Sequence, residues 1–253
     1  MTTRERPQRS VYVVLPAYNE AANVGAVLKA LERTGAETEI HFHAIVVDDG
    51  SSDPTAEIVR NYKGRMPCTL LVHASNRGLG ATIRDGLLKA IEQAEDADVI
   101  VTMDADDTHT PGAIVGMVAK IDEGYDVLVA SRYQKGSLCV GVPWLRRFVS
   151  YAGSLLFRAV HPVAGVRDFT CGYRAYRAAI LRQALKRYRT EFIDQDGFQC
   201  VVDILLKLSR MNLRFGEVPL VLRYDRKGGK SKMKLVPTAC RTLLLLFRRR
   251  LGM

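Results

Sequence analysis

Short apolar runs alternate with longer amphipathic stretches through the first half of the chain. The apolar, β-branched runs predict buried strands at residues 11–16, 41–53, 68–73, 98–107 and 126–132. Between the runs, apolar residues recur near the helical period, as at Val24, Val27, Leu28 and Leu31. Strands that alternate with helices predict βαβ units, and therefore an α/β fold with one mostly parallel, Rossmann-like sheet flanked by helices.

The second half is less regular. We expect an apolar helix interrupted by arginines at 144–160, a turn around Gly172 and a second helix at 198–211. A strand pair or bent strand at 213–224 precedes a basic, glycine-rich loop at 226–234 and a final helix at 235–250. No apolar run approaches the ~18 residues that a membrane-spanning helix needs.

Composition and cysteine usage restrict the class of protein. With 47% hydrophobic and 25% charged residues among 253, the chain is globular rather than disordered or fibrous. The N-terminal MTTRERPQRS has no apolar segment after its charges, so it is not a secretory signal. Five scattered cysteines form no CxxC pair, which indicates reduced thiols in a cytoplasmic protein.

Charge is distributed very unevenly. Residues 1–131 carry 12 basic and 20 acidic side chains, a net −8, whereas residues 132–253 carry 25 and 7, a net +18. The basic half is expected to meet anions such as phosphates or an anionic lipid surface. Nucleic acid is not the expected partner, because the basic residues lack interleaved aromatics and the acidic strand ends would repel it.

Polar residues cluster where the predicted strands end, which is where ligands bind in parallel sheets. Asp104 and Asp106 follow an apolar strand, and two neighbouring carboxylates favour a hard cation such as Mg²⁺ or Mn²⁺. A buried carboxylate in the Asp48-Asp49-Gly50 segment could accept a hydrogen bond from a base N–H. The segment 16–20 could supply a stacking ring and ribose contacts.

These motifs together resemble glycosyltransferase family two. LPAYNE, VVDDGSSD, NRGLGATIRDG and MDADD occur in this order over roughly residues 10–135. The resemblance implies a GT-A fold, a nucleotide-sugar donor and inversion at the anomeric carbon. It implies a metal pair and a set of donor contacts. The metal pair is Asp104 and Asp106; the donor contacts are Pro16, Tyr18, Glu20, Asp48, Asp49, Asn76, Gly80, Asp104, Ala105 and Asp106.

The second half is similar to the polyprenyl-phosphate sugar transferases, the dolichyl-phosphate mannosyltransferase group. The similarity rests on SRYQKG (131–136), DFTCGYRAY (168–176) and RKGGKSK (226–232). It implies a polyprenyl-phosphate acceptor, with Asp106 and Arg132 as catalytic residues. The implied phosphate-binding residues are Arg132, Arg146, Ser150, Arg226 and Lys232. A sugar nucleotidyltransferase is disfavoured, since no glycine-rich phosphate loop follows the first strand.

Two features leave the metal ligands and the acceptor open. Thr108 stands where the family commonly has a glutamine metal ligand, so either Thr108 or His109 could approach the metal. Asp194 and Asp196 could act as a general base, which a hydroxyl acceptor needs and an ionised phosphate does not. The alternative is therefore a soluble family member that glycosylates a small-molecule hydroxyl.

The domain plan that follows has three parts. A disordered tail (1–10) precedes a GT-A domain (11–234), whose donor and metal half is 11–132 and whose acceptor half is 133–234. Residues 235–253 form a basic amphipathic helix. Helices 144–160 and 235–250 are candidates for contact with anionic headgroups. We expect peripheral association with the cytoplasmic face of a membrane, without a spanning segment and with a possible membrane-anchored partner subunit.

Overall fold

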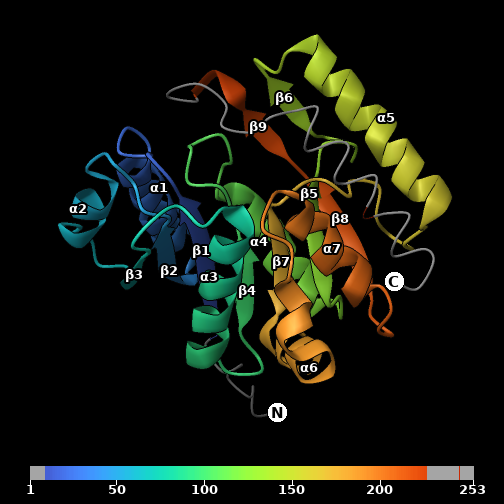
Figure 1. Ribbon diagram of the computed structural model, residues 1–253, viewed down its shortest axis with the longest axis horizontal. Helices are drawn as coiled ribbons and strands as arrows, with labels where there is room; N and C mark the ends of the chain where they lie inside the picture. The colour runs from blue at the N-terminus through green and yellow to red at the C-terminus, as the bar shows by residue number, and fades with distance from the viewer. Residues whose placement is uncertain (1–8, 227–244, 246–253) are drawn as a thin grey trace, which may run out of the picture.

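A central sheet with helices packed around it forms the body of the molecule (Figure 1). The computed structural model describes residues 9–226 and Leu245. The strand order is β3-β2-β1-β4-β7-β5-β8, and every pairing is parallel except those of β7. The strands are β1 (Ser10–Ala17), β2 (His41–Asp48), β3 (Cys68–Val72), β4 (Val99–Thr102), β5 (Val127–Ser131), β7 (Arg174–Arg177) and β8 (Phe215–Pro219). The mostly parallel sheet is confirmed.

Both halves of the chain contribute helices that pack on the sheet. Helix α3 packs on β1 and β2, α4 on β5 and β8, and α6 on β7. The predicted face of α1 is buried through Val24, Val27, Leu28 and Leu31. The helices are α1 (Val24–Thr38), α2 (Thr55–Arg60), α3 (Leu79–Gln93), α4 (Gly112–Asp122), α5 (Trp144–Val160), α6 (Ala178–Tyr188) and α7 (Gln199–Leu208), with 3₁₀ turns η1 (Arg189–Ile193) and η2 (Tyr224–Arg226).

One central strand was not predicted. β7 runs antiparallel between β4 and β5, in the stretch where the sequence indicates only a turn. Polar and apolar residues do not alternate along β7 in the way that is typical of a half-buried strand. Its first residue, Arg174, is fully buried and donates to the carbonyls of Val201 and Phe169. In the sequence, arginine is a polar residue that interrupts the apolar run expected of a buried strand, so the hydrophobic pattern could not reveal β7.

Helix α5 stands apart from the sheet, beside a small second sheet of β6 (Leu138–Val140) and β9 (Val221–Arg223) (Figure 1). Its C-terminal half is attached to the body by Phe157, which is 2% exposed and stacks on Phe169 with ring centroids 5.5 Å apart. Within the described residues, none of the helices has the length and apolar character needed to span a bilayer. The final helix predicted at 235–250 falls almost wholly outside the described residues.

Candidate functional site

The carboxyl ends of β1, β2, β4 and β5 open into one cleft of about 1480 Å³. The strand order reverses between β1 and β4, and crevices form at such switch points because neighbouring connections leave in opposite directions. Most of the residues predicted for the site line this cleft. They are Pro16, Tyr18, Glu20, Asp49, Asn76, Asp104, Ala105, Asp106, Arg132 and Ser150.

Other predicted residues lie elsewhere. Asp48 is 2% exposed, and its carboxylate accepts hydrogen bonds from the backbone N–H and the hydroxyl of Ser51, which fixes the turn after β2. Gly80 is also outside the cleft lining, and so is Arg226, which lies near Asp107. Lys232 and the side chain of Arg146 fall outside the described part of the chain.

Asp49, the neighbour of Asp48, organises the wall of the cleft next to β2. Its Oδ1 accepts the backbone N–H of Arg77 at 2.9 Å and its Oδ2 accepts that of Gly78 at 2.9 Å. His73 Nδ1 lies 2.7 Å from Oδ1, and His73 Nε2 lies 3.1 Å from Asp85. The carboxylate therefore holds the turn that carries Asn76 at the cleft.

The acidic loop after β4 presents its two carboxylates differently. Asp104 has 51% of its side chain exposed, whereas Asp106 is 7% exposed. Asp106 Oδ1 accepts the hydroxyl of Thr108 at 2.6 Å and its backbone N–H at 3.2 Å. Asp107, between them, has a left-handed φ of 58°, which turns the loop back on itself. Thr108 thus orients Asp106.

His109 closes this loop against the second half of the chain. Its Nδ1 accepts the backbone N–H of Asp104 at 3.4 Å, and its ring stacks on Tyr173 with centroids 4.9 Å apart. Thr108 also accepts a hydrogen bond from the backbone N–H of Arg223 at 2.8 Å. In the part of the chain that the structure describes, no three His, Cys, Asp or Glu side chains gather as a metal site. The loop after β4 thus presents two carboxylates, those of Asp104 and Asp106, at the cleft.

Arg132 lies at the cleft in a two-point ion pair. Its Nε donates to Asp168 Oδ2 at 2.8 Å and its Nη2 to Asp168 Oδ1 at 2.6 Å, while Nη2 also donates to Thr170. Asp168 is fully buried. Burial alone would raise the pKa of Asp168, but the charge and hydrogen bonds of Arg132 outweigh it and hold the pKa below its usual value.

A second carboxylate fixes this pair. Glu217 on β8 accepts the backbone N–H groups of Arg167 at 2.6 Å and Asp168 at 2.7 Å. Burial raises the pKa of Glu217, and these two backbone hydrogen bonds oppose the rise. The sequence gives no sign of this support, because Asp168 and Glu217 lie far from Arg132 along the chain.

The loop between η1 and α7 brings a further carboxylate to the cleft. Asp196, Gly197 and Phe198 line it, whereas Asp194 is held by Lys207, whose Nζ lies 2.9 Å from Asp194 Oδ1 and 2.6 Å from Asp203 Oδ2. Lys207 and Asp203 are buried, at 3% and 1% exposed side chain. Burial would raise the pKa of Asp194, but Lys207 outweighs it and the pKa is lowered.

The loop that carries Asp196 contacts the first half of the chain at Gly80. The backbone N–H of Gly80 donates to the carbonyl of Asp196 at 2.7 Å, and a Cβ at this position would lie 1.7 Å from the carbonyl oxygen of Gln195. Only glycine permits this close approach. The predicted glycine therefore positions Asp196 rather than touching the cleft.

Helix α5 contributes another part of the cleft lining. Ser150, predicted for this role, lines the cleft together with Arg147, Val149 and Leu156. Arg147 is a cleft residue that the sequence analysis missed, although it is adjacent to the predicted Arg146. A pair of neighbouring arginines in a helix points in two directions, and sequence alone does not say which faces the cleft.

Comparisons with known proteins agree on one family. Residues 12–185 match the model of Glycosyl transferase family 2. Polyprenol monophosphomannose synthase of Mycolicibacterium smegmatis is 30% identical over 90% of this chain and 82% of its own. Undecaprenyl-phosphate mannosyltransferase of Micrococcus luteus is 31% identical over 88% and 87%.

The fold is shared with a more distant protein of known structure. Glucosyl-3-phosphoglycerate synthase from Mycobacterium tuberculosis, solved with Mn²⁺, UDP and phosphoglyceric acid, superposes with a TM-score of 0.69. The match covers 97% of this chain and 79% of that one, at 19% sequence identity.

Proposed function

Because the chain belongs to glycosyltransferase family 2 and has the GT-A fold, we propose that it transfers a hexose, with mannose the first candidate, from a nucleoside-diphosphate sugar to a polyprenyl phosphate. The chain is a nucleotide-sugar-dependent glycosyltransferase by this membership. One observation carries the finer assignment. The acidic pair Asp104 and Asp106 lines the same cleft as Arg132, Arg147 and Ser150.

The donor belongs at the end of the cleft made by β1, β2 and β4. Tyr18 offers an aromatic face there, and the turn held by Asp49 presents Asn76 and backbone groups. These groups fit a nucleoside, while the diphosphate would reach the acidic pair. The assignment of a nucleoside is supported by the UDP that the distant structural neighbour carries.

The acidic pair fits a divalent cation with substrate ligands. Asp104, half exposed, and Asp106, held by Thr108, would be the two residues that hold Mg²⁺ or Mn²⁺, ions that proteins usually bind through one or two carboxylates together with substrate phosphates. When bound, the cation would neutralise the charge that develops on the departing diphosphate. Thr108 would then act by orienting Asp106, because its hydroxyl is committed to that carboxylate.

The acceptor phosphate belongs at the wall formed by β5 and α5. An ionised phosphate oxygen attacks the anomeric carbon, the bond to the diphosphate breaks, and no proton has to be removed from the nucleophile. The acceptor must be held in line, which Arg132, Arg147 and the hydroxyl of Ser150 can do as cationic and hydrogen-bonding groups. Arg132 is a pre-positioned donor, since Asp168 fixes its guanidinium plane.

The decisive experiment is a donor and acceptor panel. The protein is incubated with Mn²⁺ or Mg²⁺ and GDP- or UDP-sugars, with and without a polyprenyl phosphate, and nucleoside diphosphate release is measured. Release that requires both a nucleotide sugar and the lipid phosphate is the expected result. Release with a hydroxyl acceptor alone would select the alternative.

The alternative function has one observation in its favour, since Asp196 lines the cleft and could serve a hydroxyl acceptor as general base. For a phosphate acceptor, we expect Asp196→Asn to retain turnover within about tenfold, because general-base catalysis supplies roughly 10²–10⁴ where it operates. Asp194→Asn is the comparison, as Lys207 holds that carboxylate. A loss of turnover in the 10²–10⁴ range confined to Asp196→Asn would favour the hydroxyl acceptor.

We further propose that the chain works at a membrane surface, through one face of α5. Trp144, Phe148, Tyr151 and Leu155 follow one another at helical spacing and are 77%, 63%, 58% and 55% exposed. An exposed apolar stripe of this kind marks an interaction surface, and a lipid acceptor supplies a membrane. The relatives named for polyprenyl substrates support the same placement.

The lone tryptophan gives this proposal a direct readout. We expect the fluorescence of Trp144 to shift to shorter wavelength on lipid vesicles and to be quenched by brominated acyl chains. Leu155→Ser should weaken vesicle binding by about tenfold, since burying a leucine contributes roughly 1.5–3 kcal/mol. Leu88→Ser on α3, 43% exposed, is the matched control and should bind unchanged. Equal binding by both variants would contradict the membrane role of the stripe.

A further inference from the structure

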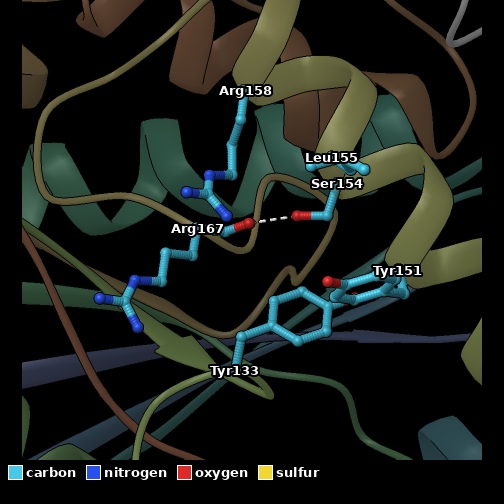
Figure 2. Close-up of a pocket in the computed structure, with 6 residues that line it drawn as sticks. All are labelled: Tyr133, Tyr151, Ser154, Leu155, Arg158 and Arg167. Carbon is cyan, nitrogen blue, oxygen red and sulfur yellow. Dashed lines mark hydrogen bonds between the residues drawn. The ribbon is translucent and has the colours of Figure 1, made fainter.

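A second cavity, of about 320 Å³, lies beside α5 and has no part in the proposed transfer. It is lined by Tyr133, Tyr151, Ser154, Leu155, Arg158 and Arg167 (Figure 2). Two tyrosines are shared with the wall of the cleft, while both arginines belong to this cavity alone. None of the lining residues is acidic.

The two arginines lie on two segments, α5 and the stretch before Asp168, that are joined by a hydrogen bond. Arg158 extends from α5, and Arg167 belongs to the segment that leads to Asp168. The hydroxyl of Ser154 donates to the carbonyl of Arg167 (Figure 2). Glu217 accepts the backbone N–H of Arg167 at 2.6 Å. The backbone positions of both arginines are therefore held by buried polar groups.

Neither guanidinium is neutralised by a carboxylate within the described residues. Other arginines of this chain, such as Arg132, Arg182 and Arg223, form ion pairs with aspartates. Two unpaired guanidinium groups at one cavity repel each other, so an anion placed between them is favoured. Arginine also matches the geometry of phosphate oxygens.

A buried hydroxyl adds a neutral donor. The hydroxyl of Tyr133 is screened from solvent, and its polar neighbour is the side chain of Ser150. A buried O–H at the cavity can donate a hydrogen bond to an anionic oxygen. Figure 2 shows the Tyr133 ring on the side of the cavity away from Arg158, beside Tyr151.

The cavity adjoins the exposed stripe of α5. Tyr151 and Leu155 belong to both, and Arg158 follows Leu155 by three residues, so it continues the same helix face. A helix that lies in the bilayer interface places its apolar residues among acyl chains and its arginines at the level of the headgroups. The cavity would then face the phosphates of the lipid.

We propose that this cavity binds the phosphate of an anionic phospholipid, such as phosphatidylglycerol, between Arg158 and Arg167. This inference rests on the proposed membrane placement of α5 and adds a specific headgroup site to it. A bound headgroup would fix how the molecule is rotated on the membrane, and so where the cleft opens relative to the surface.

The test compares two variants that remove the same charge. Arg158→Gln with Arg167→Gln alters the cavity, whereas Arg33→Gln with Arg60→Gln alters exposed residues on α1 and α2, at the opposite end of the molecule (Figure 1). Binding is followed by Trp144 fluorescence on vesicles of phosphatidylcholine alone and of phosphatidylcholine mixed with phosphatidylglycerol. We expect the cavity variant to bind the mixed vesicles about 30-fold more weakly and the control to bind as wild type. Equal weakening of the two variants would overturn the site.

Two further measurements separate this proposal from others. Glycerol 3-phosphate in solution should not displace the protein from mixed vesicles; displacement would assign the cavity to a soluble phosphate. With a short, water-soluble polyprenyl phosphate and no vesicles, the cavity variant should keep wild-type turnover. Loss of that turnover would place the cavity in the acceptor site and overturn the headgroup role, whereas a wild-type protein inactive on this acceptor would refute the proposed transfer instead.

Discussion

Asp106→Asn is expected to lower the rate of sugar transfer by about a thousandfold, the scale of removing one group that stabilises charge in a transition state. Asparagine keeps the shape of the side chain and can still accept the hydrogen bonds from Thr108, so the loop should retain its conformation. Only the negative charge at the cleft is lost. The measurement is turnover at saturating donor and acceptor with Mn²⁺ or Mg²⁺.

The neighbouring carboxylate supplies the control. Asp107 lies next to Asp106 but outside the cleft lining, so Asp107→Asn should keep turnover within a fewfold of wild type. Asp104→Asn should resemble Asp106→Asn, because both carboxylates face the cleft. Full activity of Asp106→Asn, or undiminished turnover in EDTA, would show that the acidic pair holds no cation needed for transfer.

The second large effect concerns stability and transfer together. Arg132→Ala removes the only cation that forms an ion pair with Asp168 among the described residues, and Asp168 is fully buried. Loss of one partner of a buried pair costs about 3–5 kcal/mol of unfolding free energy, because the remaining buried carboxylate loses its ion-pair partner. We therefore expect Arg132→Ala to be strongly destabilised in denaturant titrations and inactive in transfer.

A double variant separates the two consequences. Arg132→Ala with Asp168→Ala removes both charges and should recover part of the lost stability, since no uncompensated carboxylate remains. Transfer should stay low, because the donor at the cleft is still missing. If the double variant regained activity with stability, Arg132 would act only by holding the fold.

The parallel core and its strand ends are encoded locally, so the sequence alone could place them. Val13, Ile45 and Val101 lie in continuous apolar runs, Asp104 follows such a run directly, and Asn76 follows one within four residues. The groups that hold the site in shape are set by distant contacts. Asp168, Glu217 and Lys207 reach their partners across the fold, and no periodicity in the chain reports such pairs.

The same distinction explains the individual differences. Asp48 and Asp49 are adjacent in sequence, and only the path of the backbone after β2 decides that Asp49 faces the cleft while Asp48 binds Ser51. Gly80 was predicted from its motif. Glycine is required there because the backbone at Gln195, which lies outside the motif, passes too close for a side chain. The motif resemblance thus names residues around the cleft, whereas the contacts of each residue depend on parts of the fold that the motifs do not contain.

The antiparallel β7 has a consequence for any attempt to exchange acceptor preference between relatives. β5 ends at Ser131 within the first half, yet it pairs only with β7 and β8, both supplied by the second half. A fragment cut after residue 132 would leave β5 without neighbours and β4 with an open edge. Chimeras joined at that point would have to rebuild the middle of the sheet, so grafts confined to α5 and its flanking loops are the safer route to new acceptors.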